Sequence, residues 1–551
     1  MNNGTIWETV KKFLAAISGF ALLMTCILPR LNSVDFKLNA DSEKGTVGDI
    51  VNTLNCWNPY CFDENTRPDP ENDVMSFVDY IELMTATGGN AESDPFVDPL
   101  DRTTLDDYDF SRIVASCRGV LNLGAKPFLV LGNIPLKLSA EPVIGGFGYN
   151  VCPPEDYNEW YRFLCAYITA LTDEFGRDEV KAWRFGVFTE YENDDWFYDG
   201  DRDPEASLVA YCKIYDYAVK ALTDTLGDGV FVGAHSMTVT EGLWDERDFI
   251  RHCASGTNYA TGETGTHISF LTSSFYDSTI YKPTSGMRPA ECVSFLRNAA
   301  EEAGLYGLEY GFDEGRILGG RKGASDGQLL PRSVGQTVQA AYDAKLYKEL
   351  AECGASWFSS WGYTAGGAVN GYPSVAYHTA RLFSRTNGMS IIASSADAHG
   401  VTGAERDVLA VKDSRTGTVL MLAYNFKRSA LYRSPSKMNF EISDSSLIGK
   451  NVEIRTYLIN DDCNFFDEWE ADAKKYMLTG ELMEWSPDSY ILDGNILPEE
   501  LREKYESELR EKYKKCAKLG FSVDTVAVEE TLSFSVTADA NSAVFVEIIP
   551  K

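Results

Sequence analysis

The sequence predicts an α/β protein built on a (β/α)8 TIM barrel, followed by a C-terminal antiparallel β-sandwich domain. Two observations predict this fold. From about residue 46 to 388, short apolar runs alternate with amphipathic stretches, as the strands and helices of a parallel sheet do. After residue 389 the pattern changes to closely spaced alternating strands. A chain of 551 residues has room for both domains, because a barrel alone needs about 250 residues.

The repeat of helix and strand is clearest between residues 111 and 190. The stretch at 111–124 has helical spacing and ends in glycine, and the apolar run KPFLVLG at 126–132 follows it as a strand. The same order recurs at 161–188, where the strand ends at Thr189 and Glu190. No GxGxxG or Walker A pattern follows a strand, so the sequence favours a barrel over a nucleotide-binding doubly wound sheet.

The two ends of the chain carry their own signals. Residues 389–551 contain strand-like runs such as RDVLAVKD, TGTVLMLAYNF, NVEIRTYLI and TLSFSVTAD, interrupted near 498–520 by a charged segment that predicts a solvated helical insertion. Within residues 1–30, an uncharged apolar run at 13–28 follows two lysines and is typical of a signal peptide or a membrane anchor. We therefore expect an exported protein, either extracellular or attached to a membrane through residues 13–28.

The composition excludes several classes of function. With 82 acidic and 50 basic side chains, the formal net charge of −32 repels a phosphate backbone, so no nucleic-acid partner is expected. The 12 cysteines and 5 histidines lack the spacing of a metal site, so the sequence predicts no metal and no cofactor. No G-x-S-x-G nucleophile elbow is present, which argues against acyl transfer.

Two glutamates are predicted at the ends of barrel strands. Glu190 follows the apolar run WRFGVF, and Glu309 lies in LYGLEYG, with Glu314 shortly after it. Active sites of such barrels form where the strands end. Cleavage of a glycosidic bond needs two carboxyl groups, one to protonate the leaving oxygen and one to attack or stabilise the anomeric centre. We therefore predict Glu190 and Glu309 as the catalytic pair of a glycosidase.

Other side chains near predicted strand ends are candidates for substrate binding. Trp361 is expected to lie under a sugar ring, although a core plug at the barrel mouth fits its position equally well. His235 is expected either to contact the substrate or the acid/base glutamate, or to be a hydrogen-bonded structural imidazole. Asn133, Trp57 and Glu314 are expected to line the wall of the site.

Several segments resemble family 39 of the glycoside hydrolases, the β-xylosidases and α-L-iduronidases in a clan of retaining barrel enzymes. The resemblance covers roughly residues 105–385, with weaker traces further on. The segments that carry it are YDFSRIVASCRGVLNLGAKPFLVLGNIP, DEFGRDEVKAWRFGVFTEYEN, LYGLEYG, GYPSVAYHTARLFSRTNG and, in the later β-domain, NFFDEW.

The resemblance implies roles for individual residues. It implies that Glu190 is the acid/base and Glu309 the nucleophile of a retaining mechanism, with carboxyl groups about 5–5.5 Å apart. It also implies that Tyr276 hydrogen-bonds the nucleophile. Thr189 replaces the asparagine that binds the sugar 2-hydroxyl in the family, and Tyr191 replaces a proline. Because threonine keeps a hydroxyl group, Thr189 is still expected to contact substrate.

The sequence therefore predicts a retaining glycoside hydrolase that cleaves terminal, xyloside-like sugars from oligo- or polysaccharides by double displacement. Two alternatives stay open. The departures at Thr189 and Tyr191 also fit a non-catalytic carbohydrate-binding surface protein on a degenerate barrel. Transfer to a sugar acceptor in place of water would keep the same fold. A carbohydrate partner is expected in every case, and two carboxyl groups facing one another would favour an enzyme.

Overall fold

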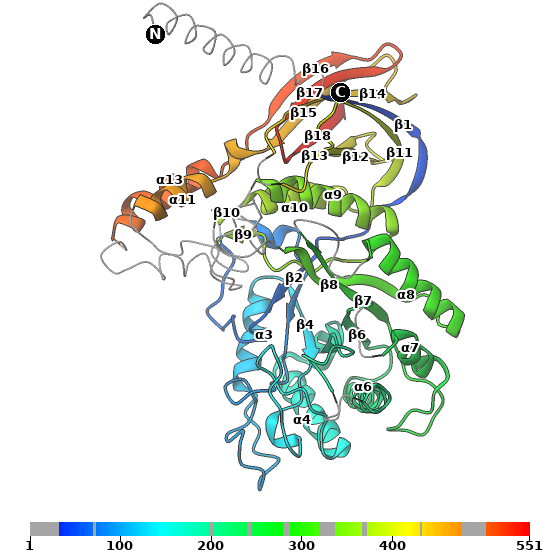
Figure 1. The fold of residues 1–551 in the computed structure, drawn as a ribbon, viewed down its shortest axis with the longest axis vertical. Helices are drawn as coiled ribbons and strands as arrows, with labels where there is room; N and C mark the ends of the chain where they lie inside the picture. Colours follow the sequence, from blue (N-terminus) through cyan, green and yellow to red (C-terminus); the bar gives the residue numbers. More distant parts are fainter. Residues whose placement is uncertain are drawn as a thin grey trace, which may run out of the picture.

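The structure is a computed structural model that describes residues 32–69, 73–198, 203–239, 244–278, 287–318, 337–365, 372–429, 432–475 and 503–551. The predicted export segment at 13–28 lies outside these ranges, as does the start of the predicted insertion at 498–520. Within them, no helix is long and apolar enough to cross a membrane. Figure 1 shows a parallel sheet with helices around it in the lower part of the molecule, and a second, large sheet above that contains the C-terminus.

A seven-stranded parallel sheet forms the centre of the lower part, with its strands hydrogen-bonded in sequence order. The strands are β2 (Thr53–Cys56), β3 (Tyr80–Leu83), β4 (Lys126–Leu131), β5 (Arg184–Thr189), β6 (Phe231–Met237), β7 (Phe270–Ser278) and β8 (Glu309–Leu318). The helices of this half of the chain are α3 (Ser111–Asn122), α4 (Tyr157–Phe175), α5 (Arg177–Lys181), α6 (Pro204–Leu226), α7 (Glu246–Ser255), α8 (Pro289–Ala303), α9 (Val338–Cys353) and α10 (Val375–Ser384).

The segment at 356–360 brings the two edges of this sheet together. A parallel bridge joins Phe358 to Phe312 of β8, and another joins Ser360 to Leu54 of β2. The sheet is therefore nearly closed, and its parallel strands have the barrel-like arrangement that the alternating pattern predicts.

The helices form where the sequence caps them and gives them one apolar face. At the start of α4, the Asp156 side chain accepts a hydrogen bond from the Asn158 backbone N–H, and Gly176 with φ 86° ends the helix. The buried residues of α4 recur every three or four positions, which places them on one face. They are Trp160, Phe163, Leu164, Tyr167, Ile168 and Leu171, and all belong to the main apolar core.

The upper part is one large curled sheet of nine strands (Figure 1). In spatial order its strands are β16 (Ser522–Ala527), β15 (Asn451–Ile459), β18 (Ser542–Pro550), β13 (Val419–Phe426), β12 (Glu405–Lys412), β11 (Ser390–His399), β1 (Ser33–Thr46), β14 (Ser436–Ser443) and β17 (Leu532–Ala538). The pairs are antiparallel, except that β1 lies parallel to β14.

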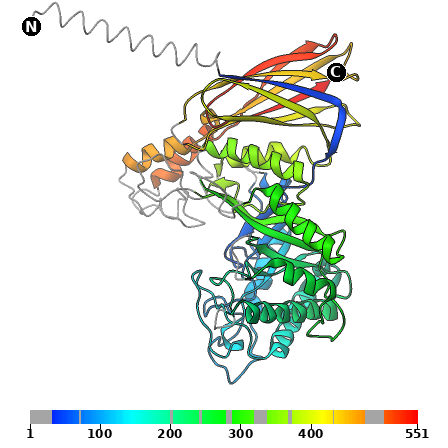
Figure 2. The ribbon, with the colours of Figure 1, turned by 45° about the vertical axis from the view of Figure 1, so that its right-hand side comes forward.

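Strand β1 precedes the parallel sheet in the sequence but belongs to the upper sheet, as Figure 2 shows. It pairs with β11 on one side and β14 on the other, and its alternate side chains Val34, Phe36 and Leu38 enter the apolar core of that sheet. The chain therefore leaves the upper sheet after β1, forms the parallel sheet, and returns at β11. The predicted domain boundaries do not include this strand.

Strand β13 links the cores of the two parts. Its sequence VLMLAYNF is buried along its whole length, so its side chains alternate between two apolar environments. Val419 and Met421 pack inside the upper sheet, whereas Leu420 and Leu422 join the main core on the side of α9. The two parts therefore share a continuous apolar contact.

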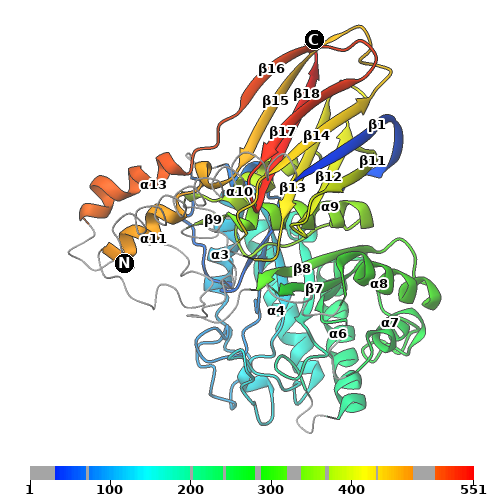
Figure 3. The ribbon, with the colours of Figure 1, turned by 45° about the horizontal axis from the view of Figure 1, so that its top comes forward.

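Two further helices lie together beside the upper sheet (Figure 3). They are α11 (Phe466–Lys475) and α13 (Arg510–Cys516), and the Tyr513 hydroxyl of α13 donates to the Asp472 carboxylate of α11 at 3.0 Å. Of the predicted insertion at 498–520, the described part is helical from 503 to 516.

Replacing Trp357 with alanine should destabilise the parallel sheet by about 3–5 kcal/mol, because a fully buried indole leaves a large cavity. Trp357 packs against Phe128 and Phe270, and the Arg184 guanidinium lies 4.3 Å from its ring centroid. Urea denaturation followed by circular dichroism measures the change. Tyr306→Ala, at a side chain that is 74% exposed, is the control and should change stability by less than about 0.5 kcal/mol. Equal effects of the two substitutions would contradict this account.

Candidate active site

The strands of the parallel sheet are irregular at their carboxyl ends. Relative to their neighbours, β5, β6 and β8 each contain one extra residue near the end, a β-bulge, and on β5 and β8 these extra residues are Phe188 and Asp313. Phe188, Glu190 and Ser236 have positive φ angles of 58°, 41° and 53°. Bulges of this kind redirect side chains and concentrate beside active sites, as do strained backbone angles. The carboxyl end of the sheet therefore has the features of an active site.

Glu190 and Glu314 are brought together at this end. The Ser274 hydroxyl of β7 lies 2.6 Å from Glu190 Oε1 and 3.4 Å from Glu314 Oε1. The two carboxylate oxygens are therefore no more than about 6 Å apart, the sum of those distances. The bulge at Asp313 produces this arrangement, because it makes Glu314, and not its neighbour, the partner of Ser274 across the β7–β8 pair.

The prediction that Glu309 faces Glu190 is wrong. Glu309 is the first residue of β8, where it pairs with Phe270, the first residue of β7. It therefore lies at the amino end of the sheet, near Arg184, whose pKa it influences. The reason is that LYGL at 305–308 is not a strand: the helix before it ends at Gly304, and Gly307 has a φ of 75°. The strand starts at Glu309, and Glu314 lies further along it, directly after the bulge at Asp313.

Two hydroxyl groups donate to the Glu314 carboxylate, one to each oxygen. The Ser236 hydroxyl donates to Oε1 at 3.0 Å, and the Tyr276 hydroxyl donates to Oε2 at 2.5 Å. The Trp361 indole N–H in turn donates to the Tyr276 oxygen at 2.9 Å. Tyr276 was expected to hydrogen-bond the predicted nucleophile Glu309, and it donates to Glu314 instead. Donors aimed at both oxygens hold Glu314 in one orientation.

Glu190 has a different environment. Its carboxylate accepts hydrogen bonds from Ser274 and from Asn193 Nδ2 at 3.0 Å. Burial and, second, the nearby charge of Glu314 together raise the pKa of Glu190 to about 8, against the opposing effect of these hydrogen bonds. Glu190 therefore keeps its proton at neutral pH, as a general acid must.

Aromatic side chains surround the carboxylate pair. Trp57 lies 5.6 Å from Trp196 and 6.0 Å from Trp361, measured between ring centroids, and Phe147 stacks on Trp196 at 4.6 Å. Trp196 also hydrogen-bonds Glu190. The structure thus brings the predicted residues Trp57 and Trp361 to the site, where their rings provide apolar surface next to the carboxyl groups.

Three predicted substrate-binding residues are buried and bonded to protein groups. Asn133, which is 2% exposed, donates to the backbone carbonyls of Asn150 and Trp196 at 3.0 Å each. The Thr189 hydroxyl lies 3.0 Å from His235 Nδ1, and these two side chains are 3% and 0% exposed. Of the alternatives for His235, the structure favours the hydrogen-bonded structural imidazole.

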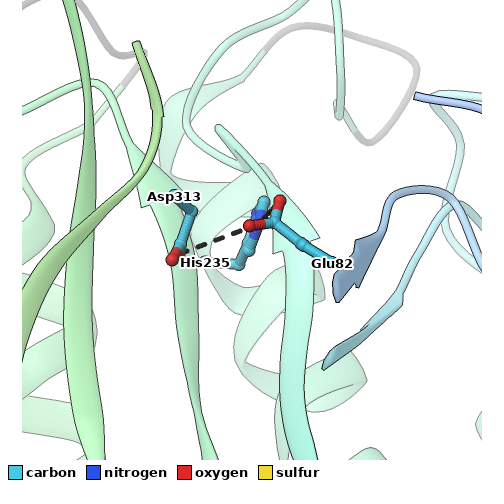
Figure 4. A group of neighbouring side chains, drawn as sticks. All are labelled: Glu82, His235 and Asp313. Atoms are coloured by element: carbon cyan, nitrogen blue, oxygen red, sulfur yellow. Dashed lines mark hydrogen bonds and ion pairs between the residues drawn. The ribbon is translucent and has the colours of Figure 1, made fainter. Parts of the chain in front are cut away.

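His235 belongs to a fully buried polar group with Glu82 of β3 and Asp313 of β8, which we call the inner cluster (Figure 4). His235 Nε2 lies 2.8 Å from Glu82 Oε1 and 3.7 Å from Asp313 Oδ2. Within the described ranges, this is the group whose ligand atoms lie close enough to share a metal ion. Hydrogen bonding accounts for it without an ion, because Asp313 already accepts from Thr272 and from the Trp357 indole N–H.

Glu82, Asp313, Ser236 and Ser274 were not predicted as residues of the site. Each stands inside an apolar or mixed run of the sequence, in YIEL, GFDEG, VGAHSM and LTSSFY. A polar residue inside a predicted barrel strand was the available signal, because the inside of a barrel is normally filled by apolar layers.

Comparison with known proteins fits this geometry. The model of the Glycosyl hydrolases family 39 matches residues 101–301, a range that contains Glu190 and ends before β8. A beta-xylosidase of Caldicellulosiruptor saccharolyticus is 26% identical over 198 residues, which is 36% of this chain and 38% of that protein. Over residues 101–301 this chain is therefore similar to family 39 of the glycoside hydrolases. The chain spans well under half of the length of the relative that it matches.

Solved structures support the same assignment at the level of the fold. A monomeric beta-xylosidase from Caulobacter crescentus CB15 superposes with a TM-score of 0.62 at 16% identity, covering 94% of this chain and 99% of that one. A bacterial orthologue of human α-L-iduronidase gives a TM-score of 0.62 at 13% identity, covering 94% and 84%. The family 39-like chain therefore shares both of its parts with these proteins.

Glu190 should titrate with a pKa near 8, and Glu314→Gln should lower that pKa because it removes a neighbouring negative charge. Infrared difference spectra of the carboxylic acid band, assigned with Glu190→Gln, measure the titration directly. Glu309→Gln is the matched control and should leave the pKa unchanged, because Glu309 lies at the other end of β8. A larger shift from Glu309→Gln than from Glu314→Gln would contradict the pairing.

Proposed function

We propose that this protein is a retaining glycoside hydrolase in which Glu314 is the nucleophile and Glu190 the acid/base. The observation that carries the proposal is the Ser274 hydroxyl, which reaches both carboxylates and holds their oxygens within about 6 Å of each other. Retaining enzymes need carboxyl groups about 5–5.5 Å apart, whereas inverting enzymes need about 6.5–9.5 Å to admit a water molecule. The nucleophile is thus reassigned from Glu309 to Glu314.

The two glutamates divide the reaction between them. In the first step a Glu314 oxygen bonds to the anomeric carbon while the glycosidic bond breaks and Glu190 gives its proton to the leaving oxygen. In the second step the Glu190 carboxylate takes a proton from water, whose oxygen bonds to the anomeric carbon and releases Glu314 from the ester. Because its pKa is raised, Glu190 carries the proton that the leaving oxygen needs. The hydrogen-bond donors Ser236 and Tyr276 hold the Glu314 carboxylate in place for attack.

The proposal extends to the architecture. We infer that residues 356–360 act as the eighth strand of a (β/α)8 barrel, because their bridges reach both β8 and β2. We also infer that the curled upper sheet functions as a sandwich, since strands from both its halves enclose one apolar core.

The sugar we propose is a terminal, xyloside-like one, in keeping with the names of the proteins that this chain resembles. Export through residues 13–28 is proposed as well, and N-terminal sequencing of the secreted protein tests it.

The main alternative was a non-catalytic carbohydrate-binding protein. Its support came from Thr189 and Tyr191, but the Thr189 hydroxyl is directed to His235, and Tyr191 is a buried core residue stacked on Tyr211 at 3.8 Å. These departures therefore alter the interior next to the site and leave the carboxylate pair in place. No specific observation favours transfer to a sugar acceptor over hydrolysis.

The purified protein should release the aryl group from one member of a panel of aryl glycosides: xyloside, arabinoside, galactoside, glucoside and uronide. Glu314→Gln should lower the rate by about 10⁴-fold or more, because the nucleophile is lost. Glu190→Gln should lower it by about 10²–10⁴-fold, because a positioned acid is lost. The decisive control is Glu309→Gln, which should retain nearly full activity. Abolished activity in Glu309→Gln, or silence of the wild type across the panel, would refute the proposal.

The sugar released should keep the anomeric configuration of the substrate. Two successive displacements at the anomeric carbon, first by Glu314 and then by water, restore the starting configuration. Proton NMR of the first product formed, before mutarotation, distinguishes the two anomers. Appearance of the opposite anomer would show that water attacks directly and that Glu314 is a base.

A further inference from the structure

The inner cluster of Glu82, His235 and Asp313 lies directly next to the carboxylate pair along the chain. Thr189, which contacts His235, immediately precedes Glu190, and Asp313 immediately precedes Glu314. We propose that Glu82 is a positioning residue that acts as a neutral carboxylic acid: its O–H group donates a hydrogen bond to His235 Nε2 and so fixes the strand end that carries Glu190. This inference rests on the proposed function only for its kinetic test.

Asp313 has the hydrogen-bonding surroundings of an ionised carboxylate. It accepts three hydrogen bonds: from the Thr272 hydroxyl, from the Ser236 backbone N–H at 3.2 Å, and from the Trp357 indole N–H at 2.7 Å. Both Asp313 oxygens act only as hydrogen-bond acceptors, which is the pattern of a deprotonated carboxylate. Burial raises the pKa of Asp313 to about 6, and the hydrogen bonds from Thr272 and Trp357 oppose that rise. Asp313 is therefore mostly ionised at neutral pH.

Glu82 has the opposite surroundings. Its Oε1 faces His235 Nε2 at 2.8 Å, and its Oε2 accepts no well-formed hydrogen bond. Burial raises the pKa of Glu82 well above its usual value; the Ser359 hydroxyl opposes this, the charge of Glu314 adds to it, and Arg184 opposes it least. A carboxyl group that is fully buried with one nitrogen partner keeps its proton, because the charged form would be left without adequate donors.

The His235 ring accepts the hydrogen bond from the Glu82 O–H group. Burial lowers the pKa of His235, so its ring is neutral and carries one N–H. The ring contacts the Thr189 hydroxyl through Nδ1 at 3.0 Å, and the Phe188 backbone also accepts a hydrogen bond from it. With the N–H on this side, Nε2 is left as an acceptor that faces Glu82. The proton of Glu82 thereby selects the tautomer that binds the bulge.

This contact matters because the bulge is strained. Phe188 and Glu190 both have positive φ angles, which cost about 1–3 kcal/mol each unless the surroundings hold them. His235 binds at Phe188 and Thr189, between the two strained residues, so its orientation bears on where the Glu190 carboxyl group points. A neutral Glu82 also adds no negative charge beside Glu314.

Nitrogen-15 NMR of labelled histidine tests the assignment without any substrate. We expect the His235 signals to show a neutral ring protonated at Nδ1 around neutral pH, in the wild type and equally in Glu82→Gln, whose amide N–H replaces the donor. A doubly protonated His235 in the wild type that becomes neutral in Glu82→Gln would overturn the proposal. So would one equivalent of a divalent metal ion that the wild type retains and Glu82→Gln loses.

Kinetics test the positioning role. Glu82→Gln should keep kcat/KM within about threefold of the wild type and leave the alkaline limb of the pH profile unmoved. Glu82→Ala should lower kcat by about 10–100-fold with little change in KM and should shift that limb, as losses of supporting hydrogen bonds commonly do. Asp313→Asn is the contrasting variant. Its amide N–H group would face one of the groups that donate to Asp313 in the wild type, so this variant should lose activity although its side chain has a similar shape.

The outcomes separate the two proposals. If Glu82→Gln loses as much activity as Glu82→Ala, the neutral-acid role is refuted while the glycosidase remains. If the wild type cleaves no glycoside but His235 has the expected tautomer in the wild type and in Glu82→Gln, the proposed function fails and the assignment of Glu82 stands.

Discussion

The Ser274 hydroxyl group lies within hydrogen-bonding distance of two carboxylates, and the surrounding strands must keep Glu190 and Glu314 at the separation this imposes. Two negative charges this close repel each other strongly in a desolvated setting, so they cannot both be ionised without cost. One of them therefore retains a proton. Burial of Glu190, together with this repulsion, keeps the proton on Glu190, as the acid of a glycosidase requires.

The bulges explain how parallel strands satisfy that constraint. In a regular strand successive side chains alternate between the two faces, so a residue one position away from an inward-facing one points outward. The extra residue at Asp313 lets both Asp313 and Glu314 contact polar groups of the interior. On β5, Phe188 is inserted in the same way before Thr189 and Glu190. Each bulge thus gives one strand two consecutive functional side chains, one for the inner cluster and one for the carboxylate pair.

Much of this could be predicted from the sequence, but the strand limits could not. Glu190 follows a strand with a short apolar centre that is buried along its whole length, so its position at the carboxyl end could be predicted. Strand β8 reads as EYGFDEGRIL, in which glycines and charges hide the strand because its inner face meets polar partners. The apolar residues just before it, LYGL, attracted the strand prediction and with it the nucleophile. Strand β1 could not be placed because its partners lie some four hundred residues later in the chain.

The inner cluster shows why the protonation of buried groups matters as much as their position. Beneath the carboxylate pair lie Glu82 and Asp313, with Arg184 as a cation further down the interior. Were Glu82 ionised as well, its charge would act on Glu314, which the donors Ser236 and Tyr276 hold for attack. Asp313 tolerates its charge because three donors reach it, whereas Glu82 has His235 as its close partner. The hydrogen-bond donors around Glu82 and Asp313 therefore decide which of these two groups carries charge. Glu190 keeps the proton that the leaving group needs for a different reason, because its burial and the neighbouring charge of Glu314 outweigh its own hydrogen bonds.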